Sequence, residues 1–302
     1  MSAAEAQRIR GLEELQAADA ETFGGKSASL GELLRAEIPV PPGFAISTAA
    51  SEEMTDTLRR DIAARYAGLG EGAAVAVRSS AVGEDSAEAT FAGQQDTYLW
   101  VRGVDGICEA VQKCWASLHN PQAVAYRERF SIANPAMGVT IQLMVDAAIS
   151  GVMFTCNPVS GDRSMMAINA SWGLGLAVVG GEVTPDDYLV SKITSEIVRE
   201  TISDKHVEYV AGDDGPVEIE VADDRRHEPC LDHDVIVRLI EVGRRVERHF
   251  GSPQDIEWAI NHGGELFVLQ SRPVTAVPKR EPAPPAGSAM SLIFNKFGAG
   301  GS

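Results

Sequence analysis

Apolar residues recur along this chain at two spacings, one typical of helices and one typical of strands. Some stretches repeat them every three or four positions, which places them on one face of an α-helix: residues 29–38, 106–118 and 235–250. Shorter apolar runs have the length of buried strands: residues 73–77, 97–101, 138–145, 151–154 and 165–169. The mixture predicts an α+β, or mixed α/β, fold.

The last part of this pattern predicts a β-hairpin. Residues 255–260 and 265–273 have the character of two strands joined by a Gly-rich turn. Side chains alternate between the two faces of a strand, so Glu257 points away from the apolar face of the first strand. That apolar face holds Ile256, Trp258 and Ile260. On the second strand we expect one face to carry Leu266, Val268, Gln270 and Arg272.

Three polar side chains of this hairpin form a candidate binding site. An even number of residues in the connecting loop places Glu257, Gln270 and Arg272 on one surface. Carboxylate and amide oxygens suit Mg²⁺, and a guanidinium suits a phosphate. On the pattern alone, an edge hairpin with a solvated polar face is an equal alternative.

Length and charge narrow the range of partners. The chain has 302 residues, enough for two subdomains, and 44% of them are hydrophobic, as in ordinary globular proteins. The formal net charge of −17 argues against nucleic acid and anionic membrane surfaces as partners. ATP is compatible with this charge where a local cluster of Lys and Arg acts together with Mg²⁺.

Cysteine spacing and the apolar runs indicate a cytoplasmic protein. No C-x-x-C pair occurs among Cys108, Cys114, Cys156 and Cys230. We therefore expect no zinc or redox motif. We expect free thiols in a reducing compartment. No apolar run approaches the roughly 18 residues of a membrane span, and the first ten residues contain no signal-peptide core.

The segment Phe23–Ser27, with sequence FGGKS, partly matches a phosphate-binding P-loop. The motif requires a glycine at position 20, which is Ala20 here. Lys26 stands where a helix is predicted to begin, and a cation there opposes the helix dipole. A bound phosphate reverses that cost, because helix N-termini attract anions. Taken alone, a solvated Lys26 on the first turn is the simpler interpretation.

Two further segments have the composition of ligand-binding turns. Arg78 follows a predicted strand, and residues 81–97 after it are rich in small polar residues that can close over phosphates. A polar surface loop is the alternative. Ser171–Leu176, with sequence SWGLGL, lacks the last glycine of a dinucleotide fingerprint because position 178 is Val178. A tight turn and a close backbone approach to a ligand are comparable interpretations there.

Taken together and in this order, these segments resemble the N-terminal nucleotide-binding domain of the pyruvate phosphate dikinase and phosphoenolpyruvate synthase family. That family also includes rifampin phosphotransferase and the ATP-binding subunit of phenylphosphate synthase. The matching blocks cover nearly all of residues 20–275: GGKSASLGELLRAEIPVPPGFAIS, VAVRSSAVGEDSAEATFAGQQDTYLWV, VTIQLMVDAAISGVMFTCNPVSG, INASWGLGLAVVGGEVTPDDYLV and DIEWAINHGGELFVLQSRPVT. The chain departs from the pattern at Leu176, where family members often carry Glu or Asn.

The resemblance implies an ATP-grasp-like fold in which ATP lies between two subdomains, about residues 1–150 and 151–275. It implies that Lys26 and Arg78 bind the triphosphate. The loop that includes Gly93 and Thr97 is implied to cover the phosphates, and Gln142 to lie near the adenosine.

The resemblance also assigns roles to the hairpin. It places Mg²⁺ on Glu257 and Gln270, and Arg272 on the phosphoryl group in transfer. The implied reaction passes the β-phosphoryl of ATP to a histidine and leaves AMP and Pi. Catalysis by Lys26, Arg78 and Arg272 is then mainly positioning and charge neutralisation.

The accepting histidine is expected on a separate partner protein. No acceptor motif surrounds any of His119, His206, His227, His233, His249 and His262. Residues 276–302 form a Pro/Ala-rich linker and tail, where the family's swivelling histidine domain begins. The partner is also expected to bind the final acceptor, a small molecule such as pyruvate or a phenol.

Two other functions compete with this one. An ATP-binding regulatory module without transfer activity is the first, and retention of Glu257, Gln270 and Arg272 argues against it. An ATP-grasp ligase that activates a carboxylate is the second, and the GGK, VRSS and LQSRP blocks argue against it.

Overall fold

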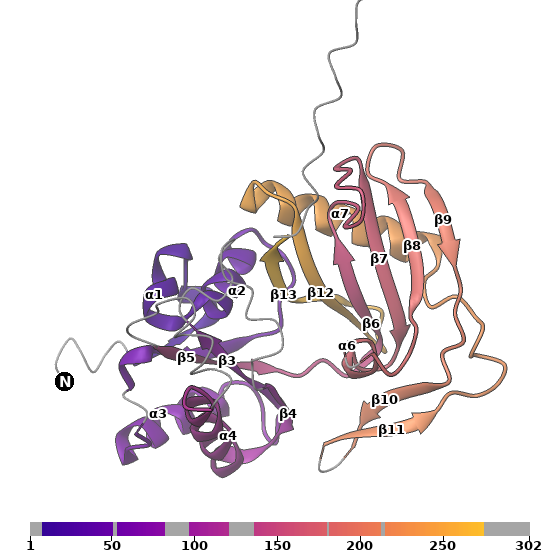
Figure 1. The fold of residues 1–302 in the computed structure, drawn as a ribbon. Helices are drawn as coiled ribbons and strands as arrows, with labels where there is room; N and C mark the ends of the chain where they lie inside the picture. Colours follow the sequence, from indigo (N-terminus) through magenta and orange to yellow (C-terminus); the bar gives the residue numbers. More distant parts are fainter. Residues whose placement is uncertain are drawn as a thin grey trace, which may run out of the picture.

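Two large antiparallel sheets, a separate two-stranded hairpin and the helices packed against them make up the described chain (Figure 1). The computed structural model describes residues 8–50, 53–81, 97–120, 136–179, 181–212 and 215–274. The last strand of the first sheet in chain order ends at Leu143, and the second sheet begins at Ala147. This architecture confirms the predicted mixed α/β fold class. The expected linker and tail, residues 276–302, lie outside the described residues.

The first sheet has five strands. In spatial order they are β1 (Ile9–Gly11), β2 (Gly43–Ile46), β5 (Met137–Leu143), β3 (Val75–Ala81) and β4 (Thr97–Val101). Helices α3 (Asp56–Ala67) and α4 (Gly103–Ser117) share a buried core with this sheet. The shorter elements around it are η1 (Leu12–Glu14), η2 (Ala17–Asp19), α1 (Ala20–Phe23), α2 (Gly25–Arg35) and η3 (Thr48–Ala50).

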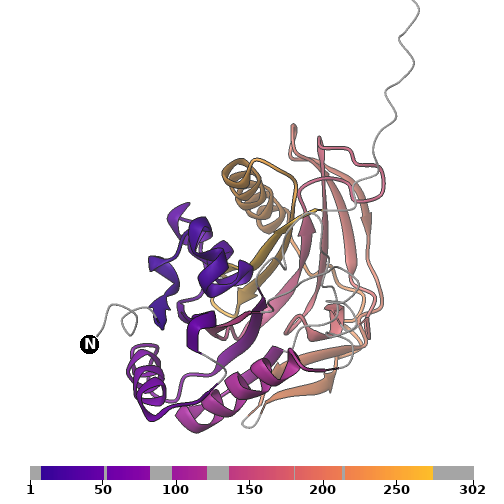
Figure 2. The same cartoon turned by 60° about the vertical axis from the view of Figure 1, so that its left-hand side comes forward.

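The second sheet has six strands and presents its hairpin edge to the first sheet (Figure 2). In spatial order they are β13 (Leu266–Pro273), β12 (Gln254–Asn261), β6 (Ala147–Phe154), β7 (Met165–Trp172), β8 (Asp186–Ser191) and β9 (Ile197–Thr201). A separate hairpin and a short helix complete the fold: β10 (Val207–Ala211), β11 (Pro216–Glu220) and α6 (Leu176–Val179).

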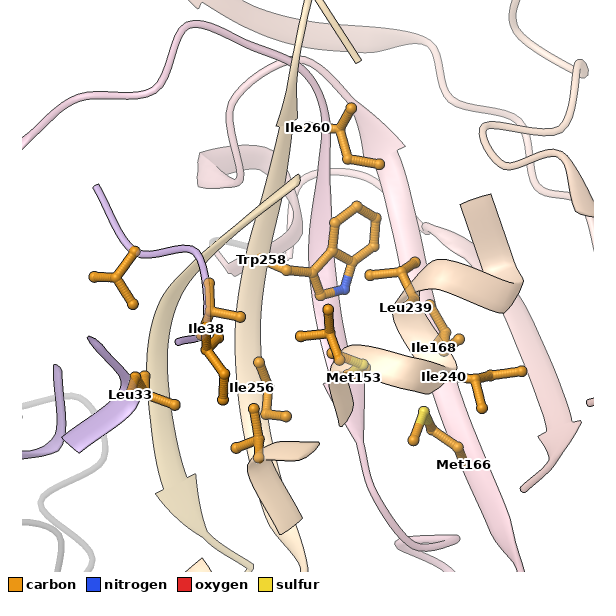
Figure 3. Close-up of a cluster of buried hydrophobic side chains, with 14 of the residues drawn as sticks. Leu33, Ile38, Met153, Met166, Ile168, Leu239, Ile240, Ile256, Trp258 and Ile260 are labelled. Atoms are coloured by element: carbon orange, nitrogen blue, oxygen red, sulfur yellow. The ribbon is translucent and has the colours of Figure 1, made fainter. Parts of the chain in front are cut away.

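Helix α7 (His233–Phe250) covers one face of the second sheet. Its buried residues recur at helical spacing: Ile236, Leu239, Ile240, Val242, Gly243 and Val246. The Asp232 side chain caps its first turn by accepting from the Val235 N–H, and Gly251 ends it with φ 71°. In Figure 3, Trp258 and its neighbours on β12 lie against this helix. No described helix has both the length and the apolar character needed to cross a membrane.

A β-bulge interrupts the pairing of β12 with β13. Trp258 pairs with Val268, whereas Glu257 pairs with Gln270. Leu269 is therefore an extra residue on β13, and the faces of the strand exchange there.

The bulge corrects one sequence-based expectation. Val268 is fully buried and belongs to the same core as Trp258. Gln270 and Arg272 lie on the opposite face, with Glu257. The expectation that Leu266, Val268, Gln270 and Arg272 share one face is wrong, because strict alternation does not allow for an inserted residue.

A buried ion pair fixes the end of the second sheet. Lys205 and Asp186 are both fully buried, and their charged atoms are 2.7 Å apart. Lys205 also donates to the carbonyl of Ser203 at 3.0 Å. Asp186 accepts from the backbone N–H groups of Ser203 and Cys230, at 3.0 and 2.9 Å. These bonds offset the cost of removing both charges from water.

We predict that Lys205→Met destabilises the chain by about 3–5 kcal/mol, because it leaves the Asp186 carboxylate buried and uncompensated. Urea unfolding measures the change. Lys113→Met is the matched control, since Lys113 pairs with Glu109 on an exposed helix face and such pairs contribute about 0.5 kcal/mol or less. Equal effects of the two substitutions would contradict the prediction.

Candidate functional site

The hairpin β12–β13 has a polar surface opposite its core face. Glu257 and Gln270 pair across the strands, and Asp255 pairs with Arg272 at the adjacent position on the same face. All four residues are partly exposed. The register therefore brings Glu257, Gln270 and Arg272 onto one surface, together with Asp255, which was not among the predicted site residues.

Asp255 holds Arg272 in place. Nε and Nη2 of Arg272 each lie 2.9 Å from the same carboxylate oxygen of Asp255. Burial raises the pKa of the Asp255 carboxyl, Arg272 offsets part of that rise, and the charge on Glu257 adds to it. The signal for Asp255 was present in the sequence, because it stands two residues before Glu257 and strand alternation puts both on one face.

Arg78 connects the first sheet to this hairpin. Its Nη1 donates to the Leu269 carbonyl at 3.3 Å and lies 3.8 Å from a carboxylate oxygen of Glu257. Its Nε is buried and has no hydrogen-bond acceptor among the described residues. The guanidinium is thus held at the junction of the two sheets, with a donor left over for a ligand.

Lys26 lies at the start of α2, against strand β3. It is 5% exposed, and its Nζ donates to the Ser79 carbonyl at 3.2 Å. The start of α2 can lie this close to β3 because position 24 is a glycine. Gly24 has φ +84°, and an added Cβ would lie 2.0 Å from the Ser80 carbonyl oxygen. The interpretation of Lys26 as a solvated first-turn residue is therefore wrong. Its ammonium group contacts β3, the strand that carries Arg78.

Two other predicted residues share a face of the first sheet with Arg78. Thr97 pairs with Arg78 across β3 and β4 and is exposed. Gln142 pairs with Ala76, two residues from Arg78, and is 2% exposed. Its Nε2 donates to the Pro41 carbonyl at 3.5 Å. Gly93, also predicted here, lies outside the described residues.

Glu257 and Gln270 fit the part of a Mg²⁺ site that a protein supplies. Mg²⁺ is usually held by one or two carboxylates, with phosphate oxygens and water completing the shell. The Glu257 side chain is 34% exposed, so a ligand other than Arg78 can reach it. Among the described residues there is no group of three or more His, Cys, Asp or Glu that could hold a metal by itself. A metal here would take the rest of its shell from phosphate oxygens and water.

The arrangement as a whole suits a polyphosphate ligand. Lys26 and Arg78 supply positive charge on one side of the junction, and Arg272 supplies it on the hairpin. The oxygen pair of Glu257 and Gln270 lies next to Arg78 and Arg272 on the same surface. Charge stabilisation and positioning are the main requirements of phosphoryl transfer.

Solved structures with a similar course of the chain have low sequence identity. A protein from Pyrococcus horikoshii, PH1788, is 14% identical with a TM-score of 0.42, over 86% of this chain and 94% of that one. The D-alanine-D-alanine ligase of Helicobacter pylori is 8% identical with a TM-score of 0.39, over 86% and 56%. At these scores the likeness carries no conclusion about this chain.

Curated relatives are more similar in sequence. A probable phosphoenolpyruvate synthase of Methanocaldococcus jannaschii is 38% identical over 90% of this chain and 27% of its own length. Another, of Methanothermobacter thermautotrophicus, is 39% identical over 88% and 46%. A rifampicin phosphotransferase of a Streptomyces species is 40% identical over 89% and 36%. The chain thus spans between about a quarter and a half of these relatives.

The family comparison covers most of the chain and includes every site residue described above. The model of the pyruvate phosphate dikinase AMP/ATP-binding domain matches residues 20–68 and 50–291. The resemblance inferred from the sequence is therefore confirmed, and the chain belongs to the pyruvate phosphate dikinase AMP/ATP-binding domain family.

Proposed function

We propose that this chain is the ATP-binding unit of a dikinase-type phosphotransferase. It binds ATP with Mg²⁺ at the junction of the two sheets and passes the β-phosphoryl group to a histidine on a partner domain or chain. The nucleotide lies between two subdomains, about residues 1–150 and 151–275. The observation that carries this proposal is the position of Arg78. It contacts Glu257, the candidate metal ligand, and it is the neighbour on β3 of Ser79, whose carbonyl accepts from Lys26.

Charge neutralisation explains the role proposed for Lys26 and Arg78. Lys26 lies on α2 and Arg78 on β3, and their side chains are largely buried. In a site shielded from water, their charges stabilise a triphosphate more strongly than they would at an open surface. Arg78 retains a buried Nε without a protein acceptor among the described residues, and a phosphate oxygen satisfies it.

Arg272 is proposed to act on the phosphoryl group in transfer. In the structure its guanidinium is held by Asp255 and its side chain is 42% exposed. A carboxylate partner of this kind orients the guanidinium, and the exposed part of the Arg272 side chain can be reached by phosphate oxygens. Glu257 and Gln270 would hold Mg²⁺ beside it, and the metal supplies additional neutralisation of the phosphates.

The proposed reaction consumes one water. The bond between the α-phosphate and the β-phosphorus breaks, and its bridging oxygen stays with AMP. A histidine nitrogen forms a P–N bond to the β-phosphorus. Water cleaves the bond between the β- and γ-phosphates, and the γ-phosphate leaves as Pi.

The accepting histidine is proposed to come from outside this unit. All six histidines of the chain are exposed, and none lies on β3, β12 or β13. One of them, His249, contacts Glu32 of α2 at 2.8 Å. The relatives named phosphoenolpyruvate synthase and rifampicin phosphotransferase support a small-molecule final acceptor, such as pyruvate or a phenol.

Mg²⁺-dependent ATP binding is the first expected result. Titration calorimetry with ATP should show binding that tightens when Mg²⁺ is added, and Glu257→Gln should remove most of that gain. Lys26→Ala should weaken binding about 10- to 100-fold, the worth of a hydrogen bond to a charged group. Lys113→Met, on an exposed helix face, is the control and should bind as wild type. No binding at millimolar ATP would exclude the proposal.

Arg272→Ala should separate binding from transfer. We expect ATP affinity to stay close to wild type, while phosphoryl transfer falls about 100-fold or more, because the Arg272 charge acts mainly in the transition state. With β-labelled ATP and a partner carrying the acceptor histidine, the label should appear on the partner, and AMP should be released. Arg199→Ala, at the far edge of the same sheet, is the control. Transfer by Arg272→Ala at the wild-type rate would refute the assigned role.

A further inference from the structure

Strand β4 contains a second bulge, and Trp100 is the residue that it redirects. Val75 pairs with Val101 and Val77 pairs with Tyr98, so Leu99 and Trp100 together oppose one residue of β3. Trp100 has φ +61°, in the left-handed region that favours glycine. A bulky residue in this conformation is strained, and such strain concentrates at ligand sites.

The redirected indole lies between the two sheets. Trp100 packs with Ala147, Leu174 and Ala259 in a small buried cluster, separate from the two main cores. Ala147 and Ala259 are on the second sheet, whereas Trp100 is on the first. The partly buried residues around this cluster are Ala74, Met144, Val145, Tyr209 and Leu269. Trp100 is thus the buried aromatic ring of an apolar junction whose surrounding residues, Tyr209 among them, are partly exposed.

The indole N–H of Trp100 has no acceptor among the described residues. The residue is 6% exposed, and its Nε1 is buried. A buried donor without a partner is costly and calls for an explanation. By contrast, Trp172 donates its N–H to the Arg225 carbonyl at 3.2 Å. Trp258 also lacks a partner, but Figure 3 places it inside the core, between β12 and α7.

This apolar cluster is continuous with the proposed phosphate site. Leu269, on its rim, is the bulged residue of β13, and its carbonyl accepts from Arg78 at 3.3 Å. A nucleotide joins a charged polyphosphate to a planar base with apolar faces and acceptor nitrogens at its edge. The chain offers matching surfaces in the same order: cations at Lys26 and Arg78, then apolar side chains and one unpartnered donor.

We propose that Trp100 determines which base this chain accepts. Its ring forms one wall of the base pocket, and its N–H donates a hydrogen bond to a ring nitrogen of adenine. A base that presents an N–H group at that position leaves two donors facing each other and is rejected. This inference rests on the proposed binding of ATP and adds the residue that distinguishes adenine from other bases.

The test compares ATP with its 1-deaza, 3-deaza and 7-deaza analogues, each of which replaces one ring nitrogen by C–H. Wild-type chain should bind one analogue about tenfold more weakly than ATP, because the indole donor then lacks its acceptor. Trp100→Phe should weaken ATP binding by a similar factor and should bind that analogue and ATP equally well. This equality identifies the pair of atoms that form the bond.

Trp258→Phe is the matched control, because it deletes an equally unpartnered N–H on the core face of β12. It should keep the wild-type preference between ATP and the deaza analogues. Equal wild-type affinity for ATP and all three analogues would overturn the inference, and this measurement does not depend on the folding of any variant. Unchanged ATP affinity in a folded Trp100→Phe chain would also overturn it. Absence of any ATP binding by wild type would instead refute the proposed function itself.

Discussion

The contact between Arg78 and the hairpin β12–β13 is the interaction on which the arrangement of the site depends. Arg78 belongs to the first sheet, and it reaches both the Leu269 carbonyl and the Glu257 carboxylate of the second. One guanidinium with several donors in a fixed plane can make such a connection and still bind a phosphate. The contact brings the candidate metal ligands to the same place as the cations. Ser29 of α2 also donates to the Ser271 carbonyl of β13 at 2.9 Å, which holds the helix of Lys26 against the same hairpin.

Two local irregularities of the sheets aim side chains at this junction. The bulge at Leu269 exchanges the faces of β13, so that Gln270 joins Glu257 while Val268 stays in the core. The bulge in β4 turns Trp100 toward the second sheet. Bulges interrupt the regular ladder and redirect side chains, and they are frequent beside active sites. In this chain they convert two regular strands into the walls of one candidate site.

Much of the site was predictable because strand alternation and segment order act locally. Alternation around Glu257 placed the apolar side chains of β12 in the core, as the burial of Trp258 shows. The same rule failed on β13, since an inserted residue leaves no mark in the hydrophobic pattern. Alternation also puts Asp255 on the Glu257 face, but its bond to Arg272 depends on the register of the two strands. The burial of Lys26 was not predicted either, for two reasons. Ser79, which accepts its hydrogen bond, is distant in the sequence, and Gly24 acts through its backbone conformation.

The sequence by itself determined the mixture of helices and strands, the polar surface of the final hairpin and, through the order of its motifs, the family. These properties follow from side-chain periodicity and from residue types at short spacing, which operate within a few positions. Tertiary structure decided which distant groups meet: Arg78 with Glu257, and Trp100 with the second sheet. Such meetings depend on how two sheets pack and on where a bulge falls. Both are set by contacts summed over the whole core, and no short segment encodes them.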